Sequence, residues 1–116
     1  MAEPPNKTLI IVVASDPRSS HRPSEAIRLA AGIAAWRKVD VTLFFTGPGV
    51  AAVSSDPDDF VDPESYTTHL PMLLEHGRPL LVDSESGPPA NRVECTAISR
   101  PQFYANAAAA TYLLRF

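Results

Sequence analysis

The chain has 116 residues, enough apolar material for one hydrophobic core, so we expect one domain over residues 1 to 116. Hydrophobic residues make up 45% and charged residues 20% of the sequence, which is typical of a folded globular protein and argues against a disordered chain. The formal charge of -3 leaves no basic stripe for a nucleic acid, and no apolar run reaches the roughly 20 residues that span a bilayer, so we expect neither partner.

The amino-terminal third predicts a strand, a turn and a helix. Residues 1 to 7 are polar and proline-rich, unlike a signal peptide, so we expect a cytoplasmic protein. Residues 8 to 14 form an uninterrupted apolar run, which is typical of a strand buried on both faces of a parallel sheet. A polar turn over residues 15 to 20 leads to a helix over 23 to 38, which Pro23 and Glu25 open.

The middle of the chain predicts two more strands with helical segments between them. Residues 41 to 46 are apolar and are ended by glycine and proline, which predicts a second buried strand. A short helix over 49 to 53 and an acidic loop over 56 to 62 follow. The next helix is expected over residues 62 to 75, kinked or divided by Pro71, and the third strand over 79 to 83.

The carboxy-terminal third completes the sheet. Residues 84 to 91 contain two prolines and a glycine and predict a turn in place of a crossover helix. An inner strand over 93 to 99, a helix over 101 to 110 and a last strand over 112 to 116 follow. Alternating strands and helices favour parallel pairing, so the sequence predicts a three-layer α/β domain with about five parallel strands.

Five short motifs follow one another across nearly the whole chain. They are the strand from Leu9 to Ala14, the alanine-rich helix with Ala26, Leu29 and Ala30, the strand exit from Phe44 to Val50, the turn from Leu74 to Gly77, and the close from Tyr112 to Phe116. In this order and spacing the chain resembles the DsrE/DsrF-like sulfur-relay family of TusD-like small domains. The resemblance implies a flavodoxin-like fold.

The resemblance also bears on activity. Active members of the family carry sulfur as a persulfide on a cysteine just after the third strand. The matching positions here are Asp83, Ser84, Glu85 and Ser86, so that cysteine is absent. We therefore expect a non-catalytic or degenerate homologue that acts as an oligomeric binding module, with a sulfur-relay protein as a candidate partner. The alternative is a sulfurtransferase or thiol enzyme that uses Cys95.

A homo-oligomer is also expected from the residues themselves. The helix over 23 to 38 carries two apolar rows, one for the sheet and one for a neighbour. Four aromatic residues exceed what so small a core is expected to bury, namely Trp36, Phe60, Phe103 and Tyr104.

Polar residues follow each predicted strand, where ligands of open parallel sheets bind. The arginines among them suit an anionic ligand, although the same residue types are common in solvated turns. The candidate ligand-binding residues are Ser15, Asp16, Arg18, Ser19 and Arg22 after the first strand, Thr46 after the second, Asp83 and Ser84 after the third, and Arg100 after the fourth.

Two candidates for catalysis remain beside this set. His21 and Asp16 would serve acid–base chemistry in a small-molecule enzyme if they shared a pocket. Glu94 lies next to Cys95, and Val93 and Ala97 flank it in a predicted strand, which favours a buried, inert thiol over a reactive one.

Other site classes lack their motifs. Asp16 and Asp83 resemble the acidic pocket of response-regulator receivers, but the fifth strand has no lysine. The turn over 15 to 20 has no glycine, so neither a dinucleotide fingerprint nor a P-loop is present, and we expect no cofactor. His69 and His76 are seven residues apart, the acidic loop lacks calcium-loop spacing, and one cysteine allows no cysteine cluster, so we expect no metal.

Overall fold

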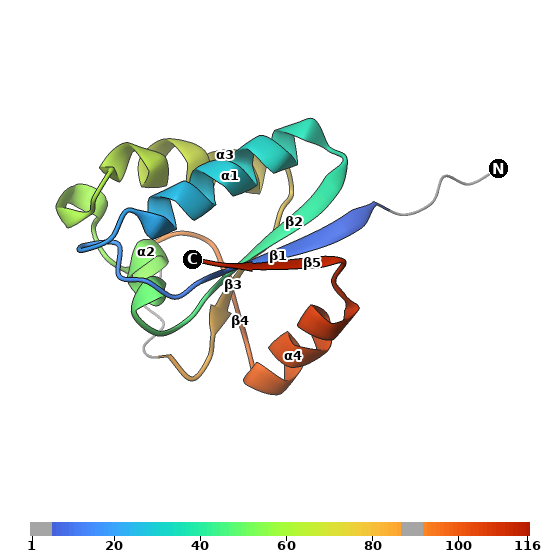
Figure 1. The fold of residues 1–116 in the computed structure, drawn as a ribbon. Coiled ribbons are helices and arrows are strands. Elements are labelled where there is room, and N and C mark those ends of the chain that lie inside the picture. The colour runs from blue at the N-terminus through green and yellow to red at the C-terminus, as the bar shows by residue number, and fades with distance from the viewer. Residues whose placement is uncertain (1–5, 87–91) are drawn as a thin grey trace.

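The computed structural model describes residues 6 to 86 and 92 to 116, and its five strands form one sheet in the order β4-β3-β2-β1-β5. Every neighbouring pair is parallel, which confirms the predicted α/β class (Figure 1). The predicted turn over 84 to 91 falls partly on residues 87 to 91, outside the described residues. The strands are β1 (Lys7–Val13), β2 (Val39–Phe45), β3 (Leu80–Asp83), β4 (Thr96–Ile98) and β5 (Tyr112–Arg115).

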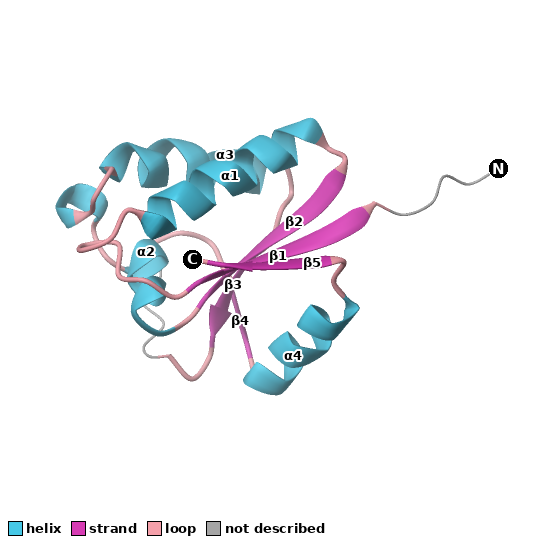
Figure 2. Cartoon of the chain, viewed as in Figure 1, coloured by secondary structure: helices cyan, strands magenta, loops and turns pink. Residues whose placement is uncertain are grey.

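Helices cover both faces of this sheet, unequally. Helices α1 (Arg22–Trp36), α2 (Ala51–Ser54) and α3 (Leu70–Glu75) lie on one face, and α4 (Arg100–Ala109) alone lies on the other (Figure 2). The predicted short helix is a 3-10 turn, η1 (Gly47–Val50), that runs into α2. The acidic loop contains a second 3-10 turn, η2 (Pro57–Asp59).

The central strand β1 shows how the sequence makes two cores. Its side chains alternate, so Leu9 and Ile11 are buried towards α1 while Ile10 and Val12 are buried towards α4. The α1 side holds most of the buried residues. The α4 side is a small core, in which the rings of Phe44 and Phe103 stack with centroids 4.1 Å apart.

Pro71 interrupts its helix, as predicted, but the interruption is a π-helical turn that the sequence did not predict. A π-helical turn, η3 (Ser65–His69), lies immediately before α3. Proline has no N–H to donate and its ring would clash with the carbonyl four residues earlier. A wider turn relieves that clash, because it shifts the carbonyls relative to the ring.

The predicted fourth strand is the main error in the fold. It was expected over residues 93 to 99 as an inner strand, whereas β4 spans only Thr96–Ile98 and lies at the edge of the sheet, paired with β3 alone. The backbone N–H of Arg92 donates to the carbonyl of Val53 at 2.7 Å, which holds the chain beside α2 before it reaches β3. Cys95 therefore precedes the strand.

The expected aromatic surplus is half correct. Trp36 and Tyr104 are each 63% exposed, as predicted. Phe60 is buried against Tyr66, with ring centroids 4.7 Å apart, and Phe103 packs on Phe44, so these two belong to the cores. The prediction missed them because the π-helical turn and α4 supply partners that the sequence pattern did not show.

Candidate functional site

The carboxyl ends of β2, β3 and β4 lie where the chain departs to opposite faces of the sheet. After β2 the chain turns to α2 on one face, and after β4 it enters α4 on the other. Ligand sites of open parallel sheets occupy such a switch in direction, because the loops part there. Asp83, the last residue of β3, stands between the two departures.

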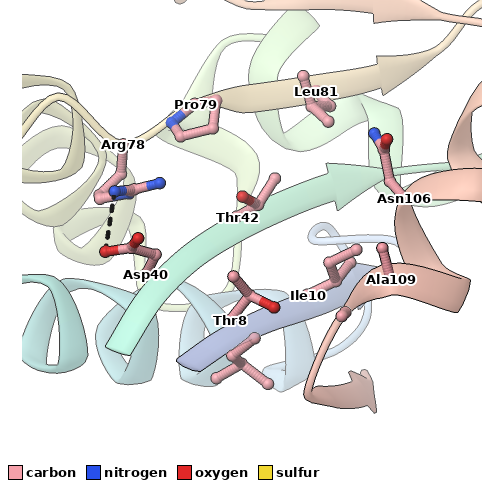
Figure 3. Close-up of a pocket in the computed structure, with 11 residues that line it drawn as sticks. Thr8, Ile10, Asp40, Thr42, Arg78, Pro79, Leu81, Asn106 and Ala109 are labelled. Atoms are coloured by element: carbon pink, nitrogen blue, oxygen red, sulfur yellow. Dashed lines mark ion pairs between the residues drawn. The ribbon is translucent and has the colours of Figure 1, made fainter. Parts of the chain in front are cut away.

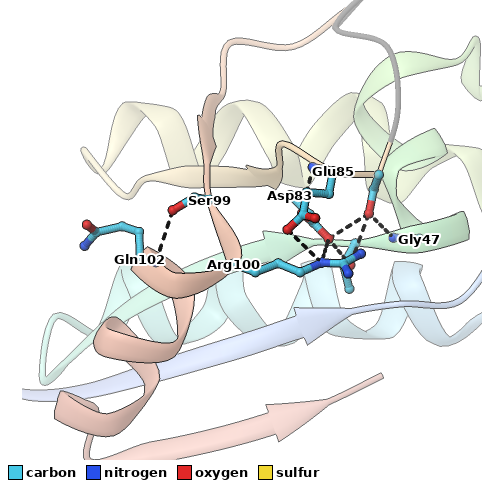
Figure 4. Close-up of polar contacts among 8 residues, drawn as sticks. Gly47, Asp83, Glu85, Ser99, Arg100 and Gln102 are labelled. Atoms are coloured by element: carbon cyan, nitrogen blue, oxygen red, sulfur yellow. Dashed lines mark hydrogen bonds and ion pairs between the residues drawn. The ribbon is translucent and has the colours of Figure 1, made fainter.

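The Asp83 carboxylate collects four donors and is only 1% exposed (Figure 4). The hydroxyls of Thr46 and Ser86 each donate to its Oδ2 at 2.8 Å, and Arg100 Nε donates to the same oxygen at 3.1 Å. The backbone N–H of Glu85 donates to Oδ1 at 2.9 Å. We call these five residues, Thr46, Asp83, Glu85, Ser86 and Arg100, the Asp83 cluster.

The electrostatics of the cluster keep Asp83 charged. Burial raises the pKa of its carboxyl, but the donors from Glu85, Thr46, Ser86 and Arg100 together outweigh burial and lower the pKa to about 2. A carboxylate this acidic and this fully bonded is a poor proton acceptor near neutral pH. Asp83 therefore orders the other side chains and does not serve as a general base.

Arg100 is the side chain of the cluster that reaches solvent. It is about half exposed, and its Nε also lies 3.5 Å from Glu85 Oε2. It opens α4, whose N-cap Ser99 accepts a hydrogen bond from the N–H of Gln102 at 3.2 Å (Figure 4). The Nε pairing orients the guanidinium, and its remaining N–H groups suit an anionic or carbonyl-bearing group.

The predicted residues after β1 form a second, separate group. Arg18 binds both carboxylate oxygens of Asp16, at 3.0 and 3.1 Å, and this pairing lowers the pKa of Asp16. His21 lies 3.3 Å from Glu25 and is largely exposed. In residues 6 to 86 and 92 to 116 no hydrogen bond or ion pair joins His21 to Asp16, so the contacts do not assemble the acid–base pair that the sequence suggested.

Of the remaining predicted residues, Ser15, Ser19 and Ser84 lie in turns and bends, and Arg22 is the first residue of α1. Ser19 donates its backbone N–H to the carbonyl of Asp16 at 3.2 Å, Ser15 is half-buried just past β1, and Ser84 donates its N–H to the carbonyl of Ile98. Arg22 donates to the carbonyl of Arg115 at 3.3 Å. Among the described residues, no hydrogen bond links this loop to the Asp83 cluster, so the predicted set divides in two.

The predicted ligand-binding set omitted two residues of the cluster, Glu85 and Ser86, and of the two Ser86 makes more hydrogen bonds through its side chain. Its hydroxyl donates to Asp83 and accepts the N–H of Gly47 at 2.8 Å, which ties the exits of β2 and β3 together. The signal was present in the sequence, because a serine three residues after a strand-ending aspartate matches a side-chain-capped turn.

Cys95 lies at the other end of the sheet from the cluster. It comes one residue before Thr96, which is level with Leu81, so it stands about 10 Å from the level of Asp83, at about 3.3 Å per residue. The sequence predicted a buried thiol, but the structure places it half-buried. This partial burial raises the pKa of the thiol. It lines a pocket of about 250 Å³ together with Arg78 and Glu94.

A groove of about 340 Å³ crosses the face of the sheet that α4 covers only in part (Figure 3). Ile10 and Leu81 lie along it, Asn106 faces it from α4, and the ion pair of Arg78 with Asp40, at 3.5 Å, closes one end. The predicted site residues are absent from the lining of this groove. The groove is amphipathic, with an apolar middle and a charged end.

Residues 6 to 86 and 92 to 116 contain neither a cluster of metal-ligating side chains nor a helix suited to a membrane. No three His, Cys, Asp or Glu side chains of this part of the chain come together as a metal would require. No helix within it is long and apolar enough to cross a membrane.

Comparison with known proteins identifies the fold and leaves the family open. No protein-family model and no curated protein matches the chain. The crystal structure of the YchN protein from E. coli is similar, with a TM-score of 0.73, 16% identity, and coverage of 95% of this chain and 99% of that one. At that identity the likeness concerns the fold alone, which is the DsrE-like α/β fold expected from the sequence.

Proposed function

We propose that this chain is a DsrE-like homologue without thiol chemistry, which works in the cytoplasm as an oligomeric binding module and recognises its ligand or partner at the Asp83 cluster. One observation carries the proposal. The segment after β3, where the resembled family carries its cysteine, holds Ser86 instead, and the Ser86 hydroxyl is committed to Asp83 and Gly47. That arrangement gives the Ser86 hydroxyl a structural role, as a link between the exits of β2 and β3.

The binding role follows from Arg100. Its guanidinium is fixed at one nitrogen and half exposed beside the start of α4, where the helix dipole also favours negative charge. We expect an anionic group of a ligand or of a sulfur-relay protein to bind there. Inorganic phosphate is a suitable probe: it should shift the amide resonances of Arg100 and Glu85, and Arg100→Gln should abolish the shifts. Arg92→Gln, which changes another half-exposed arginine, is the matched control.

The absence of thiol chemistry is tested by mass. The native chain is incubated with a small-molecule persulfide donor and its intact mass is measured. We expect no gain of sulfur, whereas the same chain unfolded in urea should gain one sulfur atom on Cys95, which shows that the donor is active. A gain on the native chain that Cys95→Ser removes would overturn the proposal.

The second candidate function, thiol transfer at Cys95, has one observation in its favour. The sulfur is half-buried at a pocket that Arg78 also lines, and a cation near a thiol favours the thiolate. Burial acts in the opposite direction and raises the pKa of this thiol. The mass measurement decides between the two functions.

A further inference from the structure

We infer that the outer edge of β5 and the adjoining side of α1 form a self-association surface, on which a second copy of this chain adds its own β5 antiparallel to the first across a two-fold axis. The inference rests on the oligomeric part of the proposed function and names the surface responsible. We call it the β5–α1 surface, and its residues are Leu29, Trp36, Tyr112, Leu113 and Leu114.

In residues 6 to 86 and 92 to 116 no strand pairs with the outer side of β5, although Arg22 donates to the carbonyl of Arg115 there. Phe116 directs both of its backbone groups at β1, donating to the carbonyl of Val12 and accepting from the N–H of Ala14, each at 2.8 Å. Backbone groups alternate along a strand, so Leu114 also faces β1 while Leu113 faces outward. All four residues of β5 are exposed; Arg115 is its one charged residue, and Tyr112, Leu113 and Leu114 carry none of the charges or prolines that usually protect a sheet edge. The outward N–H and C=O of Leu113 are therefore ready to pair.

Each face of the sheet carries an exposed leucine of β5, and the charged Arg115 shares the α4 side with Leu113. In the pairing register Ile10 is opposite Leu113 and Ile11 is opposite Leu114. Because Ile11 faces α1 and Ile10 faces α4, Leu114 lies on the α1 side of the edge and Leu113 on the α4 side. They are 42% and 53% exposed, and Tyr112 is 48% exposed. An added strand would cover both sides of this edge.

One side of α1 continues the apolar surface. Arg22, Leu29 and Trp36 are spaced by seven residues, or about two turns, so they follow one line along the helix. Arg22 donates to the carbonyl of Arg115 and its guanidinium lies 5.9 Å from the centre of the Phe116 ring. That line therefore starts beside the end of β5; in Figure 1 the start of α1 lies near this end of β5, and the two elements diverge toward the end of α1. Leu29 is 40% and Trp36 63% exposed.

The occupant that fits is a second copy of the chain. Five of the seven large apolar residues exposed in the described parts of the chain belong to this surface, and they expose on the order of 500 Å², against about 800 Å² per partner in a standard interface. An extended peptide would cover β5 and leave Leu29 and Trp36 in water. A second copy supplies both a strand for the edge and a helix for α1. A two-fold axis places β5 of one copy opposite β5 of the other, and likewise α1 opposite α1.

Sedimentation velocity of the full chain across a range of micromolar concentrations tests the surface. We expect an even multiple of the 12.5 kDa chain mass. Leu113→Lys and Trp36→Glu should each raise the dissociation constant at least about tenfold, because each buries an unpaired charge twice in a two-fold contact. Tyr104→Glu is the matched control, since Tyr104 is as exposed as Trp36 but lies on α4, and it should leave the mass unchanged.

Hydrogen exchange on the wild-type chain provides a measurement that needs no variant. The Leu113 amide should be protected in concentrated samples and exchange freely in dilute ones. An assembly that survives both substitutions, that Tyr104→Glu dissolves, or that leaves the Leu113 amide unprotected overturns the β5–α1 surface while the oligomeric module stands. A monomer at every concentration overturns both, and the persulfide result remains independent of either.

Discussion

Replacing Asp83 by asparagine tests whether the carboxylate organises the cluster. The variant keeps the shape of the side chain and removes its charge, so the donors from Thr46, Ser86 and Arg100 lose an ionised acceptor. The shift of the Asp83 pKa from 3.8 to about 2 corresponds to roughly 2 kcal/mol of unfolding free energy. Since Arg100 is half exposed and solvent screens its charge, we expect a loss of about 1 to 2 kcal/mol at pH 7.

The pH dependence follows from the sign of the shift. The folded pKa lies below the unfolded value of 3.8, so the carboxylate stabilises the fold fully above pH 3.8 and loses this effect as the pH falls towards about 2. Urea unfolding measures the free energy of both proteins from neutral to acidic pH. The difference in unfolding free energy between wild type and Asp83→Asn should be constant above about pH 5 and should become smaller below pH 3.8.

The control is Asp56→Asn, which removes an exposed carboxylate whose ion pair with Arg92 is 3.7 Å long. We expect it to change the unfolding free energy by less than about 0.5 kcal/mol. Equal stability of wild type and Asp83→Asn at pH 7, or a difference that persists unchanged through the acidic range, would refute the reasoning about the cluster.

Further predictions concern backbone positions and the thiol. Gly49→Ala should lower the unfolding free energy by about 2 to 3 kcal/mol in urea, because its Cβ would collide with the carbonyl of Val13, whereas Gly32→Ala in α1 meets open space and should stabilise by about 0.5 to 1 kcal/mol. Arg37→Gly should raise the melting temperature, since Arg37 ends α1 at φ 63, a left-handed conformation that glycine adopts more readily. Cys95→Ser should cost about 1 kcal/mol in the same urea assay, because a half-buried hydroxyl needs a partner; no loss would indicate a fully solvated thiol.

The strands that form the centre of the sheet could be predicted from local sequence. The apolar runs of β1 and β2 are long, and proline and glycine end the second one, so burial on both faces follows from composition. For β4 the pattern failed. The alternation of Val93, Cys95 and Ala97 resembled an inner strand, but a hydrogen bond from Arg92 to distant Val53 decides where pairing begins. Contacts between segments that far apart leave no mark in a local pattern.

The candidate site shows the same limit. Strand exits predicted which residues lie at one edge, and Thr46, Asp83 and Arg100 do meet there. The positions of the strand exits did not reveal that Asp16 forms an ion pair with Arg18, two residues away, or that Ser86 links the exits of β2 and β3 by hydrogen bonds. Those outcomes depend on side-chain rotamers and on the path of each turn, which residue type alone does not specify.

The position of β1 has a consequence for how the chain is made. Its two neighbours in the sheet lie at very different separations along the sequence: β2 follows after one helix, but the bonds between Thr8 and Thr111, just before β5, join residues 103 positions apart. Closing so long a loop is slow, because the chain loses conformational entropy before the strand contact contributes any stabilising free energy. During synthesis on the ribosome, the edge of the apolar strand β1 that pairs with β5 therefore stays unpaired until β5 emerges. During that interval, the nascent chain is most open to aggregation and to binding by chaperones.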